Sequence, residues 1–204
     1  SGYIHEKEAQ WKNEKAERAG KSFRAQPLYT FNDAIAALKL VKPYLYDQLF
    51  EINDEMKVVF NEAGHILGSS IVELWVDEGE PKGEKISKVV FSGDLGMINR
   101  PILKDPKKIK KADFLIMEAT YGNRVHPPNS ASVDELLGIV LKTIKRGGNA
   151  IIPSFAVGRT QELIFEFNRF YEEHPELSDT LDDIMVYVDS PMATNATEVF
   201  RNNE

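Results

Sequence analysis

Apolar and polar positions along the middle of the chain follow a pattern typical of β-strands. The Val- and Ile-rich runs Met56–Phe60, Ile71–Val76 and Ile86–Phe91 are each bounded by polar or glycine-containing segments, and such short runs predict strands. The stretch Asp77–Lys85 contains Gly79, Pro81 and Gly83, so it predicts a hairpin connection. A final strand is expected at Phe114–Glu118, after a long basic loop.

The first 45 residues predict helices instead. Residues Tyr3–Gly20 are charged and Ala-rich and end on glycine, a pattern that favours a surface helix. Thr30 and Asp33 stand where a capping box would have them. Behind them the apolar residues follow helical spacing, and Lys42-Pro43 is expected to end this second helix.

Beyond Tyr121 the pattern alternates between helix and strand. We expect helices at Ser132–Lys145 and Arg159–Tyr171, buried strands at Ala150–Pro153 and Ile184–Val188, and a last helix starting at Pro191. Alternation of this kind is typical of a parallel α/β sheet. A domain boundary is expected near residues 121–130, where two prolines stand together.

Composition narrows the classes of protein. The 204 residues are 42% hydrophobic and 28% charged, as in ordinary globular proteins. Without cysteine, any metal must bind nitrogen and oxygen ligands. No apolar run approaches 18 residues and no signal peptide is visible, so we expect a cytoplasmic protein with no membrane partner. The net charge of −7 argues against a broad nucleic-acid platform but not against a local basic groove.

Three of the predicted strands lead into a residue that can bind metal or move protons. His65 follows the first run, Asp94 the third, and Glu118 ends the last. Loops just past strand ends are common places for catalytic groups, so these residues predict one rim of a metal or acid/base site. The chain has only four histidines and no HxH or HxxxH pair, whereas a catalytic zinc takes three protein ligands. Either the site binds no metal, or this chain is part of a longer protein.

Five motifs, in order, resemble those of the metallo-β-lactamase/β-CASP nucleases. This family includes the mRNA 3′-end cleavage endonuclease and ribonuclease J. The motifs are Ala63–Ser69, Ser92–Gly96, Glu118–Arg124, Pro153–Glu162 and Asp189–Ala193.

The resemblance implies a zinc-dependent ribonuclease, with two zinc ions in the complete enzyme. It implies that His65 is a terminal ligand of one zinc and that Asp94 bridges both. Glu118 would orient a histidine that protonates the leaving oxygen. The family's HxHxDH motif and its two later histidine motifs are absent. The resemblance therefore implies an internal fragment, inactive alone, with a partial αββα metallo-β-lactamase sandwich at 1–122 and part of a β-CASP parallel α/β domain at 123–204.

A second candidate site lies where a predicted strand leads into a helix. Two interpretations stay open here. Ser154, Gly158 and Arg159 would contact a phosphate of RNA, because helix N-termini bind anions and arginine adds a bidentate contact, or Gly158 only permits a tight turn. The role of His126 stays open, and the sequence leaves room for a homo-oligomer. Two other functions also stay open: a non-catalytic phosphate- or nucleotide-binding α/β module, and a DNA-directed nuclease of the same fold.

Overall fold

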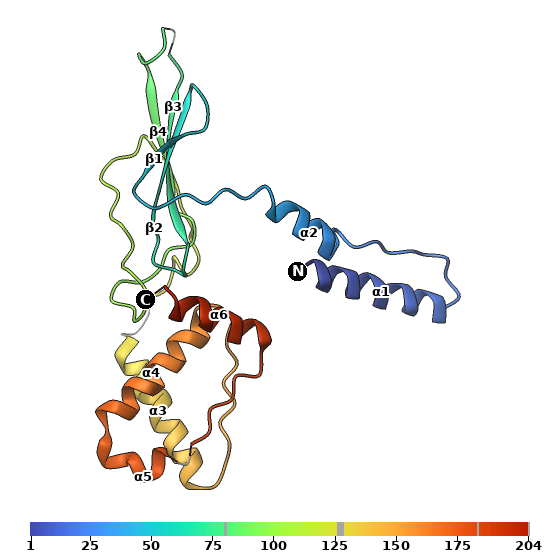
Figure 1. Cartoon of the computed structure of the whole chain (residues 1–204), viewed down its shortest axis with the longest axis vertical. Helices are drawn as coiled ribbons and strands as arrows, with labels where there is room; N and C mark the ends of the chain where they lie inside the picture. The colour runs from blue at the N-terminus through green and yellow to red at the C-terminus, as the bar shows by residue number, and fades with distance from the viewer. Residues whose placement is uncertain (80, 126–128, 183, 204) are drawn as a thin grey trace. The chain divides into compact units, whose positions relative to one another are not determined.

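The computed structural model describes residues 1–79, 81–125, 129–182 and 184–203 (Figure 1). The chain divides into two compact units, Ser1–Tyr44 and Leu45–Glu204. The boundary predicted near residue 122 separates the two domains that the family resemblance implies, not two compact units. It stays a prediction.

The first unit is a pair of helices, α1 (Gly2–Arg18) and α2 (Phe31–Leu38). The predicted capping box of α2 is confirmed: Thr30 Oγ1 accepts the Asp33 N–H at 3.2 Å, and Asp33 Oδ2 accepts the Thr30 N–H at 2.8 Å. Helix α2 ends at Leu38, earlier than the predicted stop at Lys42-Pro43. Its α-helical hydrogen bonds give way to tighter turns before the proline is reached.

The second unit begins with a five-stranded mixed sheet in the order β1-β2-β3-β4-β5. The strands are β1 (Leu49–Glu51), β2 (Met56–Glu62), β3 (Ser70–Asp77), β4 (Ile86–Phe91) and β5 (Phe114–Ile116). Neighbours pair antiparallel except β4 and β5, which are parallel. The predicted runs and the hairpin between β3 and β4 are confirmed. Strand β1 was not predicted individually, since three residues carry too little pattern.

The buried core of the sheet lies near one end of its strands. Ala63, Ile71 and Val90 pack together there, and the partly buried Leu95 and Ile109 pack against them. Leu95 and Ile109 come from the long segment between β4 and β5, so this segment is held against the sheet.

A row of polar side chains also ties that long segment to the sheet. Lys107 Nζ donates to Asn61 Oδ1 at 2.8 Å, and Asn61 Nδ2 donates to Glu73 Oε1 at 2.8 Å. Glu73 in turn forms an ion pair with Lys88. Asn61 and Glu73 are both buried, and buried polar groups need such partners. The row therefore fixes residue 107 over strands β2, β3 and β4.

The other regular elements described in the second unit are helices. They are α3 (Asn129–Lys145), α4 (Arg159–Glu173), the 3-10 turn η1 (Pro175–Leu177), α5 (Ser178–Leu181) and α6 (Pro191–Arg201). The predicted start of the last helix is confirmed, with Ser190 Oγ accepting the Ala193 N–H at 3.2 Å. Within the described residues, no helix is both long and apolar enough to cross a membrane.

The two strands predicted in this region are wrong. Residues 150–153 and 184–188 belong to no helix and to no sheet. A strand exists only through hydrogen bonds to a neighbouring strand, and neither segment pairs with another strand in the described part of the chain. The predicted burial is also absent: Ile151 is 92% exposed and Tyr187 is 78% exposed. Their apolar composition alone suggested strands. The α/β class holds for the chain, but the parallel sheet expected in 123–204 is not formed by its described residues.

Candidate active site

The ends of β2, β4 and β5 meet at one edge of the sheet. Strand β2 is antiparallel to β3, β3 is antiparallel to β4, and β4 is parallel to β5. The three strands β2, β4 and β5 therefore run in the same direction. The segments that follow them, which carry His65, Asp94 and Glu118, leave the sheet at the same end. We call this end the site edge.

The segments carrying His65 and Asp94 contact each other through their backbones. The Gly96 N–H donates to the Ala63 carbonyl at 2.8 Å. A Cβ atom added at Gly96 would stand 1.6 Å from the Gly64 carbonyl oxygen. Glycine is needed where two backbones come this close. The distance between the two segments is thus set by main-chain contact.

The His65 segment is a tight turn closed by Ser69. Ser69 Oγ accepts the N–H groups of His65 and Ile66 at 3.1 and 3.2 Å. The Ser69 carbonyl accepts the Tyr46 hydroxyl at 2.7 Å. Burial, with the nearby Glu62 charge as a smaller cause, raises the pKa of Tyr46. These bonds hold the turn while the residue His65 itself stays exposed.

The candidate ligands at the site edge are of the chemical types that bind zinc, but there are too few of them. An imidazole nitrogen from His65 and a carboxylate oxygen from Asp94 are ordinary zinc ligands, and both residues are exposed. A zinc site needs at least three protein ligands. No group of three or more His, Cys, Asp or Glu able to hold a metal occurs among the residues that the structure describes. These residues alone do not complete a zinc site.

Glu118 is half-buried and supports the segment that carries Asp94. Its Oε1 accepts the N–H of Leu95 at 2.6 Å, and its own N–H donates to Ser92 Oγ at 3.0 Å. Residues on both sides of Asp94 are therefore bonded to Glu118. Charge-assisted bonds of this kind are stronger than neutral ones. Glu118 lies beside the candidate metal ligand, where it holds the main chain of Asp94 in place.

The candidate phosphate site forms a self-contained turn before α4. Ser154 Oγ and Thr160 Oγ1 lie 2.8 Å apart in a hydrogen bond. Gly158 has a φ of +88°, which favours glycine, and its N–H donates to Gln161 Oε1 at 2.7 Å. The Gln161 amide nitrogen donates to Thr197 Oγ1 on α6 at 3.1 Å. The turn is thereby anchored to two helices.

This turn contacts the site edge. A Cβ atom added at Gly158 would lie 3.1 Å from Ile66 Cγ2, and Ile66 directly follows His65. The structure thus brings the start of α4 next to the candidate metal ligand, although 93 positions separate Gly158 from His65 in the sequence.

Arg100 and Glu162, for which no individual role was predicted, lie in the same region. Glu162 Oε1 accepts from Arg100 Nη1 at 2.5 Å, and Glu162 Oε2 accepts from Arg159 Nη1 at 3.0 Å. The Glu162 side chain is only 6% exposed. The signal available in the sequence was the spacing of Arg159 and Glu162, three positions apart on one helix face. Nothing in the sequence pointed to Arg100. His126 lies outside the described residues.

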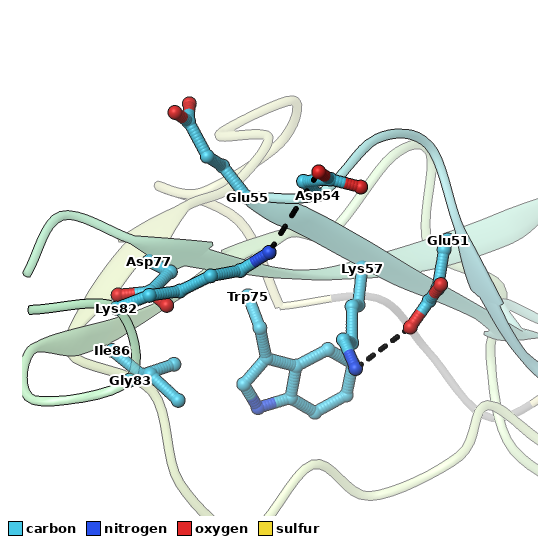
Figure 2. A pocket seen from close by; sticks show the side chains of 9 residues that line it. All are labelled: Glu51, Asp54, Glu55, Lys57, Trp75, Asp77, Lys82, Gly83 and Ile86. Carbon is cyan, nitrogen blue, oxygen red and sulfur yellow. Dashed lines mark ion pairs between the residues drawn. The ribbon is translucent and has the colours of Figure 1, made fainter.

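A cavity of about 300 Å³ lies at the opposite end of the sheet (Figure 2). Trp75 forms part of its lining, with the ion pairs Lys57–Glu51 at 2.8 Å and Lys82–Asp54 at 4.0 Å beside it. The hydrogen bond from Lys57 lowers the pKa of Glu51. Strands β2, β3 and β4 separate this cavity from His65 and Asp94. It is therefore a different place from the site edge.

Three known proteins are similar to this chain over most of its length. The chain is 33% identical over 175 residues to Ribonuclease TTHA0252 of Thermus thermophilus, which covers 86% of this chain and 37% of the relative. It is 29% identical over 175 residues to Endoribonuclease YSH1 of Yarrowia lipolytica, and this match covers 85% of this chain and 20% of the relative. It is 39% identical over 131 residues to Transcription termination factor FttA of Methanosarcina mazei, and this match covers 62% of this chain and 20% of the relative. The chain thus spans about a fifth to two fifths of these curated relatives. No family model matches it.

Proposed function

Because this chain belongs to the metallo-β-lactamase/β-CASP nucleases, we propose that it forms part of a zinc-dependent ribonuclease that hydrolyses RNA phosphodiester bonds. The observation that carries the proposal is the site edge, where the segments of His65, Asp94 and Glu118 leave the sheet together and the start of α4 contacts Ile66. This arrangement would bring a metal-binding region next to a phosphate-binding turn. We expect the enzyme to act in the cytoplasm.

In this proposal His65 and Asp94 would hold zinc together with ligands from outside the described residues. Bound zinc supplies a Lewis acid and a water of lowered pKa. Glu118 would keep Asp94 in position through the Leu95 N–H, 2.6 Å from its carboxylate. The histidine that the family resemblance pairs with Glu118 would use the second carboxylate oxygen.

Ser154 and Arg159, which are exposed, would hold a phosphate of the RNA backbone, and Gly158, whose N–H is already bonded to Gln161 Oε1, would shape the turn between them. Arg159 is the exposed residue of the first turn of α4, and its side chain is about half exposed. Arginine and a helix N-terminus together suit a phosphate oxygen. Contacts of this type position a nucleic acid without reading its bases.

The test is a cleavage assay on the full-length gene product that contains this sequence. Labelled RNA and DNA oligomers of one base sequence are incubated with the zinc-loaded protein and with its Asp94→Ala variant. Cleavage of RNA that is lost in Asp94→Ala supports the proposal. The matched control is Asp54→Ala, which removes an exposed carboxylate at the opposite end of the sheet and should cleave at the wild-type rate.

A second candidate function is RNA binding without cleavage. It is favoured by one observation: a relative of this chain bears the name transcription termination factor. RNA binding with no cleavage at any zinc concentration would select this function. Faster cleavage of DNA than of RNA would select the DNA-directed nuclease.

A further inference from the structure

Glu162 connects the Asp94 segment to the candidate phosphate site. Arg100 lies six residues after Asp94, in the segment between β4 and β5, and Arg159 is the first residue of α4. Both guanidinium groups donate to the same carboxylate, at 2.5 and 3.0 Å. No other described ion pair joins the segment after β4 to α4.

The exposures of the three side chains differ in a way that suggests separate roles. The exposed fractions are 6% for Glu162, 19% for Arg100 and 52% for Arg159. A buried carboxylate needs close cationic or hydrogen-bonding partners. Arg100, which is largely buried, supplies such a partner to Oε1. Glu162 therefore offers its second oxygen, Oε2, as a fixed acceptor for Arg159.

Arg159 is the one member of this set that can meet an external phosphate. One of its nitrogens, Nη1, donates to Glu162, and the fork of an arginine carries five N–H donors in a rigid plane. Fixing Nη1 orients the remaining donors, and the residue before Arg159, Gly158, packs against Ile66. A side chain fixed in this way loses less conformational entropy on binding.

We infer that Glu162 is a positioning residue, held by Arg100, that presents the Arg159 guanidinium to an RNA phosphate beside the candidate metal ligands. The inference rests on the proposed function, in which Arg159 contacts the RNA backbone. It adds that the affinity of this contact depends on a negatively charged residue that never touches the RNA.

The sign of one substitution separates positioning from simple electrostatics. Glu162→Gln removes a negative charge next to a phosphate site, so electrostatics alone predicts tighter RNA binding. Positioning predicts weaker binding, by about 2- to 10-fold, because Arg159 is no longer held. The measurement is fluorescence anisotropy of labelled RNA with the full-length gene product, with a chelator present to prevent cleavage.

A double-mutant cycle assigns the effect to Arg159. Arg159→Ala should weaken binding by about tenfold and lower the slope of log affinity against log salt by about 0.7. In the Arg159→Ala background, Glu162→Gln should have no further effect. The matched control is Glu166→Gln, one turn further along α4, where the carboxylate pairs with Arg169 at 2.5 Å and RNA affinity should not change. Thermal unfolding of each variant checks the fold.

A variant that keeps Glu162 in place is a second, independent test of the positioning role. Arg159→Lys retains the positive charge but loses the fork that Glu162 aligns, so affinity should fall about 2- to 10-fold while the salt slope stays unchanged.

Equal or tighter RNA binding by Glu162→Gln, an equal effect of Glu162→Gln in the Arg159→Ala background, or wild-type affinity of Arg159→Lys would each overturn the inference. If Arg159→Ala weakens binding but Glu162→Gln does not, only the inference fails. If Arg159→Ala leaves affinity and salt slope unchanged, the phosphate contact in the proposed function fails as well.

Discussion

Replacing Gly96 by alanine should destabilise the protein by pushing the His65 and Asp94 segments apart. The added Cβ would lie 1.6 Å from the Gly64 carbonyl oxygen and 2.7 Å from the His65 nitrogen. Ordinary contact begins at 3.4 Å, so the two backbones must separate by about 1.8 Å to restore a normal van der Waals distance. Both obstructing atoms are main-chain atoms, which cannot rotate away.

The expected cost follows from two effects. Overpacking with backbone displacement costs about 1–3 kcal/mol. The hydrogen bond from the Gly96 N–H to the Ala63 carbonyl, 2.8 Å long, would be stretched, which adds about 0.5–1.5 kcal/mol. A total of about 1.5–4.5 kcal/mol corresponds to a fall in the midpoint of thermal unfolding of roughly 3–18 °C for a unit of this size.

The assay is thermal unfolding followed by circular dichroism, with Gly138→Ala as the control. Gly138 lies inside α3, and a Cβ there meets nothing within 4 Å. Removing a helix-interior glycine should stabilise the protein by about 0.5–1 kcal/mol. If the unfolding midpoint of Gly96→Ala is at or above that of the wild type, the His65 and Asp94 segments do not lie as close together as described.

Three further predictions concern the candidate ligands and the turn that holds His65. In the zinc-loaded full-length gene product, Asp94→Ala should abolish turnover, whereas Glu118→Gln should slow it about 10- to 100-fold and keep the zinc content measured by elemental analysis. Zinc loss in a folded Glu118→Gln protein would make Glu118 a direct ligand. After dialysis, the 204-residue chain alone should retain less than one zinc per molecule, since a site needs three ligands; about two zincs per chain would disprove this. Burial raises the pKa of Tyr46 above its ordinary value of 10.0. The stabilisation linked to the neutral phenol is therefore complete below that value and is lost as the pH rises through the raised pKa. In an ultraviolet titration, Tyr46→Phe should remove a tyrosine that ionises above pH 10.0. Loss of a tyrosine that ionises at the ordinary pKa would contradict the raised pKa of Tyr46.

Local features of the structure followed from the sequence because they depend on neighbouring residues. The capping box of Thr30 and Asp33 joins residues three positions apart, and Pro191 begins a helix through its own fixed φ. The strands β2, β3 and β4 were predicted because their apolar runs are long enough to carry a pattern. The positions of His65, Asp94 and Glu118 just past apolar runs were also enough to identify a candidate site.

Segments whose conformation depends on distant partners could not be predicted in this way. Residues 150–153 and 184–188 have the composition of buried strands, yet they join no sheet in the described chain. Composition reports how well a segment would suit a strand, whereas a strand forms only when a second segment supplies the hydrogen bonds. The pattern contains no information about whether that segment is present.

The sequence by itself determined the order of the helices and central strands and the chemical types of the candidate site residues. Only the tertiary structure decided which groups meet: Glu118 with the Leu95 N–H, Gly96 with Gly64, and Arg100 with Glu162, 62 positions apart. The physical reason is that helices and turns are stabilised by bonds between near neighbours, whereas these contacts depend on the path of the whole chain around the sheet.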